Sequence, residues 1–219
     1  MIPFSFSSLG DFLNCPLMYY KVRVSKEIVR GETEEMKYGN IVHKKLELRL
    51  LEKQPLTEDL VHMEPFIQRL ENTEGEKFAE QKMAITEKFE PCDWFDKKAW
   101  CRAIVDVGLR YDNAVWQGDY KTGKRKPGSD QLMLSAAVRM HIDESVDYVH
   151  TSYIWLRDRK MDPGGAFTRA QIPEIWQHFL PRVRRLELAY EKNAWPARPS
   201  GLCGWCPVTK AHCKYAKHG

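Results

Sequence analysis

Residues 114–123 read AVWQGDYKTG, and this stretch decides the fold that we expect for the rest of the chain. It begins like a strand and then places Asp119, Tyr120 and Lys121 in line. Because side chains alternate between the two faces of a strand, Asp119 and Lys121 point to the same side, roughly 7 Å apart. A carboxylate there can hold a divalent cation, and an ammonium group beside it can act on a water molecule.

A second carboxylate, Asp106, lies within the apolar run AIVDVG at residues 103–108. Aspartate is depleted in strands and is rarely buried without a partner. Residues 99–112 and 114–121 are predicted to form a hairpin that turns at Asp112 and Asn113. The two carboxylates would then lie on adjacent strands, where together they would make a metal site.

The composition suits a single domain over residues 1–219, since 43% of the 219 residues are hydrophobic. The net charge is 34 − 30 = +4, which permits a nucleic-acid partner without requiring one. We find neither an apolar run long enough to span a membrane nor a secretory signal, so we expect a cytoplasmic protein with no membrane association. In that compartment, six cysteines favour metal or cluster ligation over disulfides.

Hydrophobic periodicity predicts helices interleaved with strands. The predicted helices cover residues 7–20, 34–53, 57–72, 129–141 and 173–193, with Ser7 or Ser8 and Ser129 as N-caps. Besides the hairpin, strands are predicted over the second half of residues 76–90, over 148–157 and over 166–172, with a turn at 162–165. The tail at residues 195–219 has too little periodic apolar content to fold unaided, so another part of the chain should hold it.

The motifs follow one another in a definite order: His43 on a helix, Asp106 in an apolar strand, the DYKTG sequence at residues 119–123, and Gln131 on the following helix. This order resembles the PD-(D/E)XK nuclease superfamily, and its RecB-like branch in particular. The resemblance covers about residues 6–213. A single D-x-K motif occurs by chance in many proteins, whereas the ordered set is far more specific. It implies an α/β fold of the restriction-endonuclease type, with a central mixed sheet flanked by helices and the active site at a sheet edge or fork.

The resemblance also implies roles for individual residues. His43, Asp106 and Asp119 match the metal ligands, and Tyr120 lies where such enzymes commonly lend a main-chain carbonyl to the metal. Lys121 matches the catalytic lysine, which orients the attacking water or stabilises charge on the phosphate. The carboxylate ligands suit Mg²⁺ or Mn²⁺, and a single imidazole favours Mn²⁺.

Three further features bear on this resemblance. Gln131 matches the glutamine of a Q-x-x-x-Y motif, but Ser135 stands where tyrosine is usual. Glu80 could add another acidic group to the site. The basic loop of Lys124, Arg125 and Lys126 is as consistent with a solvated surface as with a contact to DNA.

Three of the cysteines crowd the C-terminal tail with the spacing C-x₂-C-x₆-C, and one is remote at the N-terminus: Cys203, Cys206, Cys213 and Cys15. This arrangement resembles that of RecB-like nucleases with a 4Fe–4S cluster, such as AddB-type helicase–nucleases and CRISPR-adaptation exonucleases. Four thiolates around a cluster would tie the tail to the N-terminal helix. Zinc bound by four cysteines is the alternative, and Cys92 and Cys101 are expected to pack as small hydrophobic residues.

The resemblance implies a metal-dependent deoxyribonuclease, in the first place an exonuclease on single-stranded or end-bearing DNA. The size of the chain and the lack of a helicase motor suggest a phage or CRISPR-associated enzyme, working in the host cytoplasm if phage-encoded, and recombination or replication proteins as partners. A structure-specific endonuclease is one alternative. An inactive nucleic-acid-binding protein of the same fold is another, but a structural protein has no reason to bury two carboxylates and a lysine together.

Overall fold

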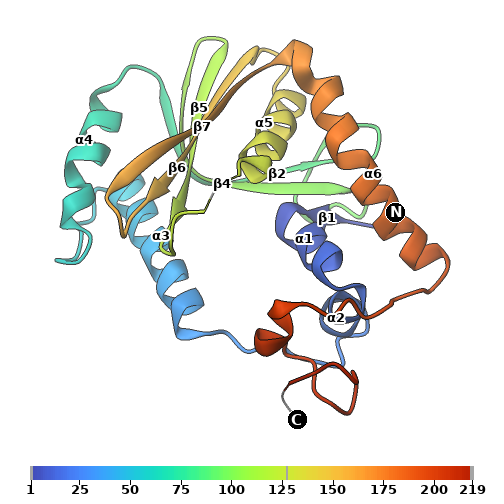
Figure 1. Ribbon diagram of the computed structural model, residues 1–219. Helices are drawn as coiled ribbons and strands as arrows, with labels where there is room; N and C mark the ends of the chain where they lie inside the picture. The colour runs from blue at the N-terminus through green and yellow to red at the C-terminus, as the bar shows by residue number, and fades with distance from the viewer. Residues whose placement is uncertain (1, 127, 218–219) are drawn as a thin grey trace. The chain divides into compact units, whose positions relative to one another are not determined.

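The computed structural model describes residues 2–126 and 128–217, which form two compact units (Figure 1). The first, here called the sheet unit, is Thr33–Trp176. The second, here called the terminal unit, joins Ile2–Glu32 with Gln177–Gly219. The expectation of one domain with a tail stays a prediction. In the part of the chain that is described, no helix combines the length and the apolar character needed to cross a membrane.

A mixed sheet forms the centre of the sheet unit, with the strand order β3-β2-β4-β5-β6-β7. Its strands are β2 (Glu76–Ile85), β3 (Pro91–Cys92), β4 (Cys101–Tyr111), β5 (Ala114–Lys121), β6 (Tyr148–Trp155) and β7 (Lys160–Thr168). Strands β5 and β6 run parallel, and the other neighbours in this order run antiparallel. The predicted hairpin is present, because β4 and β5 pair from Tyr111↔Ala114 onward.

Helices cover both faces of this sheet (Figure 1). They are α3 (Glu34–Glu52), α4 (Glu64–Asn72), which follows the short 3-10 turn η2 (Val61–Met63), and α5 (Asp130–Ile142). Leu46 of α3 and Ile67 of α4 share a core with Tyr120 of β5, whereas Met140 of α5 packs with Val115 of the same strand. Because the positions of Tyr120 and Val115 differ by an odd number, they face opposite sides of β5. The predicted α/β fold, a central mixed sheet flanked by helices, is confirmed.

The terminal unit joins the two ends of the chain. Its N-terminal part holds the two-residue strand β1 (Phe4–Ser5), α1 (Phe6–Asn14), α2 (Pro16–Tyr19) and the π-helix η1 (Tyr20–Val24). Its C-terminal part holds most of α6 (Ile172–Glu191) and the 3-10 turn η4 (Gly201–Trp205). The Leu17 N–H donates to Pro196 O at 3.3 Å, and Arg198 Nη1 donates to Leu13 O at 2.7 Å. The tail thus begins against the helices of the N-terminus.

Two predicted helix boundaries are wrong, and local chemistry explains each. The first helix is capped by Ser5 instead of Ser7 or Ser8, because the Ser5 and Ser8 side chains each bond the other's backbone. Helix α4 begins at Glu64 because Pro65, which lacks an N–H, is favoured in the first turn of a helix. The boundary predicted at Ser129 is correct, since Ser129 stands at the N-cap position of α5, although its side chain makes no capping hydrogen bond.

Two predicted strand assignments are also wrong. Strand β2 begins at Glu76, so that Glu80 lies in its middle instead of near its start. The turn predicted at residues 162–165 lies inside β7, and the chain turns just before Lys160. Gly164 is the extra residue of a bulge, because Thr151 pairs with Gly165 while Ser152 pairs with Pro163. A glycine fits there because an added Cβ would lie 2.1 Å from a Leu132 methyl.

Candidate active site

The candidate site lies where β4 separates from β5. Strand β4 pairs with β2 along its length, but its pairing with β5 ends at Val107↔Gly118. Asp106 is the next residue of β4 beyond that pair. Its Oδ2 accepts the Tyr120 N–H at 2.7 Å, so a buried carboxylate occupies the place of the next ladder bond.

Helix α3 places His43 over this fork. Its Nδ1 lies 3.4 Å from Glu80 Oε1 and 3.6 Å from Asp106 Oδ1. Its Nε2 lies 3.2 Å from the Tyr120 main-chain oxygen, the carbonyl expected to bind metal. One ligand atom each of His43, Glu80 and Asp106 lies within 4.8 Å of the others, which makes this trio a candidate cation site.

Glu80 reaches this cluster from an unusual backbone conformation. Its φ is +47°, inside a strand whose flanking residues Ala79 and Gln81 pair regularly with β4. A left-handed conformation in a non-glycine residue is strained and tends to occur at functional sites. The sequence pattern gave no sign of this conformation and indicated Glu80 only as an additional acidic group, whereas the structure places it beside His43.

Asp119, Lys121 and Gln131 form a second cluster beside the first. Asp119 and Lys121 lie on the same side of β5, as the alternation along the strand predicts, and Lys121 Nζ lies 2.5 Å from Asp119 Oδ2. Gln131 Nε2 donates to Asp119 Oδ1 at 2.6 Å, and Gln131 Oε1 accepts from Lys121 Nζ at 3.1 Å. One amide on α5 therefore holds both the carboxylate and the ammonium group in place. The Tyr153 ring of β6 lies 5.5 Å from Lys121 Nζ and faces the same ammonium group.

Burial of several charges together shifts their pKa values. Burial, and then the charge of Asp119, raises the pKa of Asp106 to about 7. Burial also raises the pKa of Asp119, although Lys121 acts in the opposite direction. Burial lowers the pKa of His43, but the hydrogen bond to Glu80 and the neighbouring carboxylates outweigh it, so the net shift is upward. A cluster of this kind favours a bound cation, which removes the repulsion among the carboxylates.

A second pair of residues supports this arrangement: Gln117, which the sequence pattern did not single out, and Ser135, which stands where the motif usually has tyrosine. Gln117, two residues before Asp119 on the same face of β5, is 1% exposed and donates through Nε2 to Ser135 Oγ at 2.9 Å. Ser135 lies one helical turn after Gln131, so α5 is joined to β5 at two successive levels. The strand alternation of Gln117, Asp119 and Lys121 was the signal that could have identified Gln117.

The three basic residues of the loop after β5 differ in their contacts. Arg125 makes a two-pronged ion pair with Asp162, with nitrogen–oxygen distances of 2.9 and 2.7 Å. Lys124 and Lys126 are exposed. The prediction of DNA contacts by this loop stays a prediction, and Arg125 is the member of the loop already engaged by a carboxylate.

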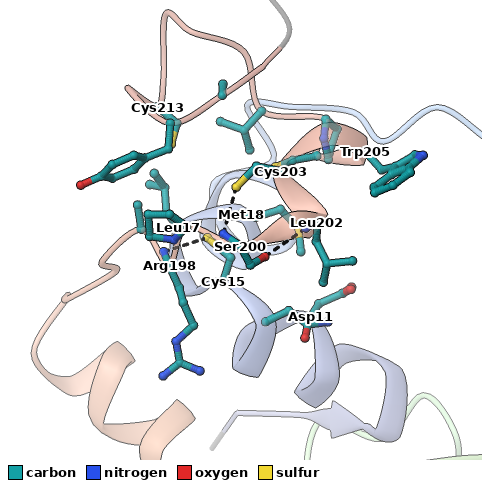
Figure 2. A pocket seen from close by; sticks show the side chains of 18 of the residues that line it. Asp11, Cys15, Leu17, Met18, Arg198, Ser200, Leu202, Cys203, Trp205 and Cys213 are labelled. Carbon is teal, nitrogen blue, oxygen red and sulfur yellow. Dashed lines mark hydrogen bonds between the residues drawn. The ribbon is translucent and has the colours of Figure 1, made fainter.

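The terminal unit contains a separate cavity of about 250 Å³ (Figure 2). All four of the predicted cluster cysteines line it: Cys15, Cys203, Cys206 and Cys213. The backbone N–H of Arg198 donates to Cys15 Sγ at 3.5 Å, and that of Ser200 donates to Cys203 Sγ at 3.4 Å. Such bonds stabilise a thiolate, the form that binds a metal or a cluster. The structure thus brings the four cysteines to one cavity. Cys101, by contrast, is fully buried, and Cys92 is half-buried.

Comparisons with known proteins point to one family. The model of the PD-(D/E)XK nuclease superfamily matches residues 3–214. A search of curated proteins finds no match. Among solved structures, the one titled "Crystal structure of SSO0001" is similar to this chain at 12% sequence identity and a TM-score of 0.47, and the match covers 94% of this chain and 84% of that one. A likeness this distant carries no conclusion about activity.

Proposed function

Since the chain belongs to the PD-(D/E)XK nuclease superfamily, we propose that it is a metal-dependent deoxyribonuclease that hydrolyses phosphodiester bonds from DNA ends. The observation that carries this proposal is the pair of adjoining clusters at the fork of β4 and β5. One is His43, Glu80 and Asp106, which can surround a cation, and the other is Asp119 with Lys121 and Gln131.

The donor set fits Mg²⁺ or Mn²⁺. Carboxylate and carbonyl oxygens are the ligands that these hard cations take, and one imidazole is compatible with Mn²⁺. Within the described residues, Glu80 Oε1 and Asp119 Oδ2 are buried without a well-formed hydrogen bond, although His43 and Lys121 lie within ion-pair distance of them. When bound, the cation would polarise the phosphate and lower the pKa of a coordinated water.

The side chains divide the remaining work. The cation would be held by three carboxylates, one imidazole and one main-chain carbonyl: Asp106, Asp119, Glu80, His43 and Tyr120. His43 contacts the carboxylates through Nδ1 and the Tyr120 carbonyl through Nε2, so as an imidazolium it can donate to both and balance their charge. Binding to a metal would release one of these protons.

Lys121 supplies a positive charge next to Asp119, where it can donate to a phosphate oxygen or orient a water for attack. Gln131 keeps that ammonium group and the carboxylate in register, because its amide bonds both at once. The Tyr153 ring limits the positions open to the ammonium group. These three residues therefore orient a phosphodiester and a nucleophile relative to each other.

The test is hydrolysis of labelled linear DNA, single-stranded and blunt-ended, beside a closed circular DNA, with Mg²⁺ or Mn²⁺ and with a chelator. An exonuclease degrades the linear substrates and spares the circle. Asp119→Asn should abolish hydrolysis while leaving the fold intact, and Glu144→Gln, which neutralises an exposed carboxylate, should not. A wild-type protein that cleaves no DNA with either cation would refute the nuclease proposal. Cleavage of the circular DNA would show that the enzyme is an endonuclease and not an exonuclease.

We further propose that the cysteine cavity holds a 4Fe–4S cluster, as in the RecB-like branch. Four cysteine thiolates are the ligand set of such a cluster. Tetrahedral zinc with sulfur at about 2.3 Å would bring the sulfurs within about 4 Å of one another. Within the described residues, no three cysteine sulfurs come within 4.8 Å of each other, and the cavity of about 250 Å³ is several times the volume of one water, ~30 Å³. Both observations favour a group larger than one ion.

Anaerobic purification followed by iron, sulfide and zinc analysis tests this second proposal. About four irons and an equal amount of sulfide per chain would support the cluster. One zinc per chain and no iron would instead assign the cavity to a structural zinc site. Neither result bears on hydrolysis, because the cavity and the candidate active site lie in different units.

A further inference from the structure

A group of cations and aromatic rings lies along the strands that lead away from Asp106. It comprises side chains of β2, of β4 and of the loop between β3 and β4, and we call it the tryptophan platform: Lys82, Trp94, Phe95, Lys97, Lys98 and Arg102. None of these residues belongs to the candidate active site. The strand register and the ring contacts show how they are arranged.

The register places Lys82 and Arg102, the two cations of the platform that lie on strands, on one face of the sheet. Lys82 pairs with Ile104 and Ala84 with Arg102, and paired residues of antiparallel strands point to the same side. Arg102, Ile104 and Asp106 alternate along β4, so they share that face as well. The distance along the strand from Arg102 to Asp106 is 106 − 102 = 4 residues, or about 13 Å. The platform therefore starts beside the candidate active site.

Two positive charges lie over the Trp94 ring. Lys82 Nζ lies 5.9 Å from the centre of this ring, and Arg102 Cζ lies 5.7 Å from it. Arg102 Nε also donates to the Trp94 main-chain oxygen at 2.9 Å, which ties the loop to β4. The indole ring is therefore fixed in position next to two cations. Such a combination can bind single-stranded nucleic acid, because bases stack on the ring and phosphates contact the cations.

Phe95 is 85% exposed, although the loop that carries it is well ordered. The N–H of Asp96 donates to Asp93 O at 3.0 Å, and the N–H of Lys98 donates to Asp96 Oδ1 at 2.7 Å. Ile104, on the sheet beside Lys82, is 40% exposed. An ordered turn that holds a phenylalanine ring in water presents a flat apolar face to a ligand.

The charge of the platform identifies the ligand. Four cations stand against two carboxylates of the same loop, Asp93 and Asp96, and Asp96 is engaged by the backbone of Lys98. A positive surface with exposed rings suits a polyanion whose bases are free to stack. In double-stranded DNA the base faces are covered by neighbouring pairs, so a single strand is the form that can use both the rings and the cations.

On the basis of the proposed nuclease function, we infer that the tryptophan platform binds the single-stranded part of the DNA substrate next to the scissile phosphate. A base would stack on Phe95, and phosphates would contact Lys82 and the neighbouring cations. The platform would thus give the enzyme a preference for DNA with single-stranded ends.

The first experiment measures binding of a fluorescein-labelled oligothymidylate by anisotropy, in the Asp119→Asn background so that the DNA stays intact. Phe95→Ala should weaken binding about tenfold, since stacking of one base is worth about 1–3 kcal/mol. Binding of a blunt duplex should not change. Tyr111→Ala is the matched control, because Tyr111 is another ring, 54% exposed, at the far end of β4.

The second experiment separates charge from stacking by varying the salt concentration. Each phosphate contact contributes about 0.7 to the slope of log K against log salt for single strands. Lys82→Ala should reduce that slope by about 0.7, whereas Phe95→Ala should lower the affinity and leave the slope unchanged. Lys160→Ala, at the start of β7, is the matched control and should change neither. A merely structural effect would not produce these two separate signatures.

Each result decides one of the two proposals. If Phe95→Ala and Lys82→Ala both bind the oligothymidylate as the parent does, the platform assignment is wrong, whether or not the wild type hydrolyses DNA. If the variants show the expected losses but the wild type cleaves no DNA, the platform stands and the nuclease proposal falls. If Phe95→Ala leaves DNA binding intact and instead breaks up an oligomer, the ring serves a protein contact and the DNA assignment is overturned.

Discussion

The two candidate cofactor sites of this protein are built in opposite ways. In the sheet unit, Asp106 and Asp119 lie on the two strands of one hairpin, and the hydrogen-bonded register brings them together. In the terminal unit, Cys15 and Cys203 come from opposite ends of the chain and meet through packing alone. The first site needs only a hairpin to bring Asp106 and Asp119 close, whereas the second needs a tertiary structure that closes a loop of nearly the whole chain.

This difference shows in what surrounds each site. Asp119 is held by Gln131 and Lys121, and Asp106 is held by the Tyr120 N–H, so neither carboxylate depends on a metal for its position. In the terminal unit, stacked and edge-on rings join the two chain segments: Phe12, Tyr19, Tyr20, Tyr190 and Trp195. A cluster or metal would add a bond between segments that otherwise meet through a few rings and hydrogen bonds. Loss of that group should therefore destabilise the terminal unit more than loss of a cation destabilises the sheet unit.

The sharpest way to break the comparison is to remove one thiolate. Cys15→Ser should abolish most of the bound iron and lower the thermal stability of the terminal unit, because Cys15 is the ligand that comes from the N-terminal segment. The affinity of the sheet unit for Mn²⁺, measured by titration calorimetry, should not change. Cys92→Ser, which removes a half-buried thiol of β3, is the control. Equal iron content in both variants would show that Cys15 is no ligand.

The next largest effect is expected from Lys121→Met, which keeps the aliphatic stem and removes the charge. Turnover should fall by about 10²–10³-fold, the usual cost of losing one group that stabilises charge in the transition state. Mn²⁺ affinity should hold or improve, because an ammonium group 2.5 Å from Asp119 is gone. Single-turnover kinetics measure the rate of hydrolysis, and a Mn²⁺ titration measures the affinity. Loss of Mn²⁺ binding would mean that Lys121 holds the site together and does not act in the reaction.

A smaller effect concerns the acidity of the sheet-unit site without metal. Because the pKa of Asp106 is raised to about 7, the folded protein holds a proton that the unfolded chain releases near pH 4. Stability therefore falls as the pH rises from about 4 to 7, and it stays reduced above pH 7. Asp106→Asn cannot ionise, so with no divalent cation added it should melt several degrees above the wild type at pH 8.

Thermal melts across pH 5–8 measure this difference, which should shrink toward the acid end. Added Mn²⁺ should stabilise the wild type more than Asp106→Asn and so reverse their order. The control is Glu144→Gln, which removes an exposed carboxylate that belongs to neither candidate site. A pH-independent gap for Asp106→Asn would contradict the raised pKa.

The smallest effect should come from the second level of contact between α5 and β5. Ser135→Ala leaves the buried amide of Gln117 without its partner, which should cost about 1–3 kcal/mol in the free energy of unfolding. Turnover should fall only a few-fold, because Gln131 still bonds Asp119 and Lys121. Denaturant melts and steady-state kinetics measure the two. Ser129→Ala, at an N-cap position without a capping bond, is the control and should change neither stability nor turnover. If Ser135→Ala lost as much turnover as Lys121→Met, this ranking would be contradicted.

Much of the sheet unit followed from local pattern. The alternation in residues 103–108 and 114–121 predicted the hairpin, and the same alternation predicted that Asp119 and Lys121 share one face of β5, where they form an ion pair. Prolines and glycines misled where tertiary context changed their meaning. Pro163 and Gly164 mark a turn in most sequences, but here they form a bulge in an edge strand, because Gly164 lies against Leu132 of α5.

By itself, the sequence determined the order of the elements and the residue types at the candidate site, because strand alternation and helix periodicity are set by neighbouring residues. Only the tertiary structure decided that Glu80 reaches His43 through a left-handed backbone, that Gln117 bonds Ser135, and that Arg125 is engaged by Asp162. It also decided that the cysteines of both chain ends line one cavity. Each of these contacts joins residues far apart in the chain, and their geometry depends on packing, which no local pattern records.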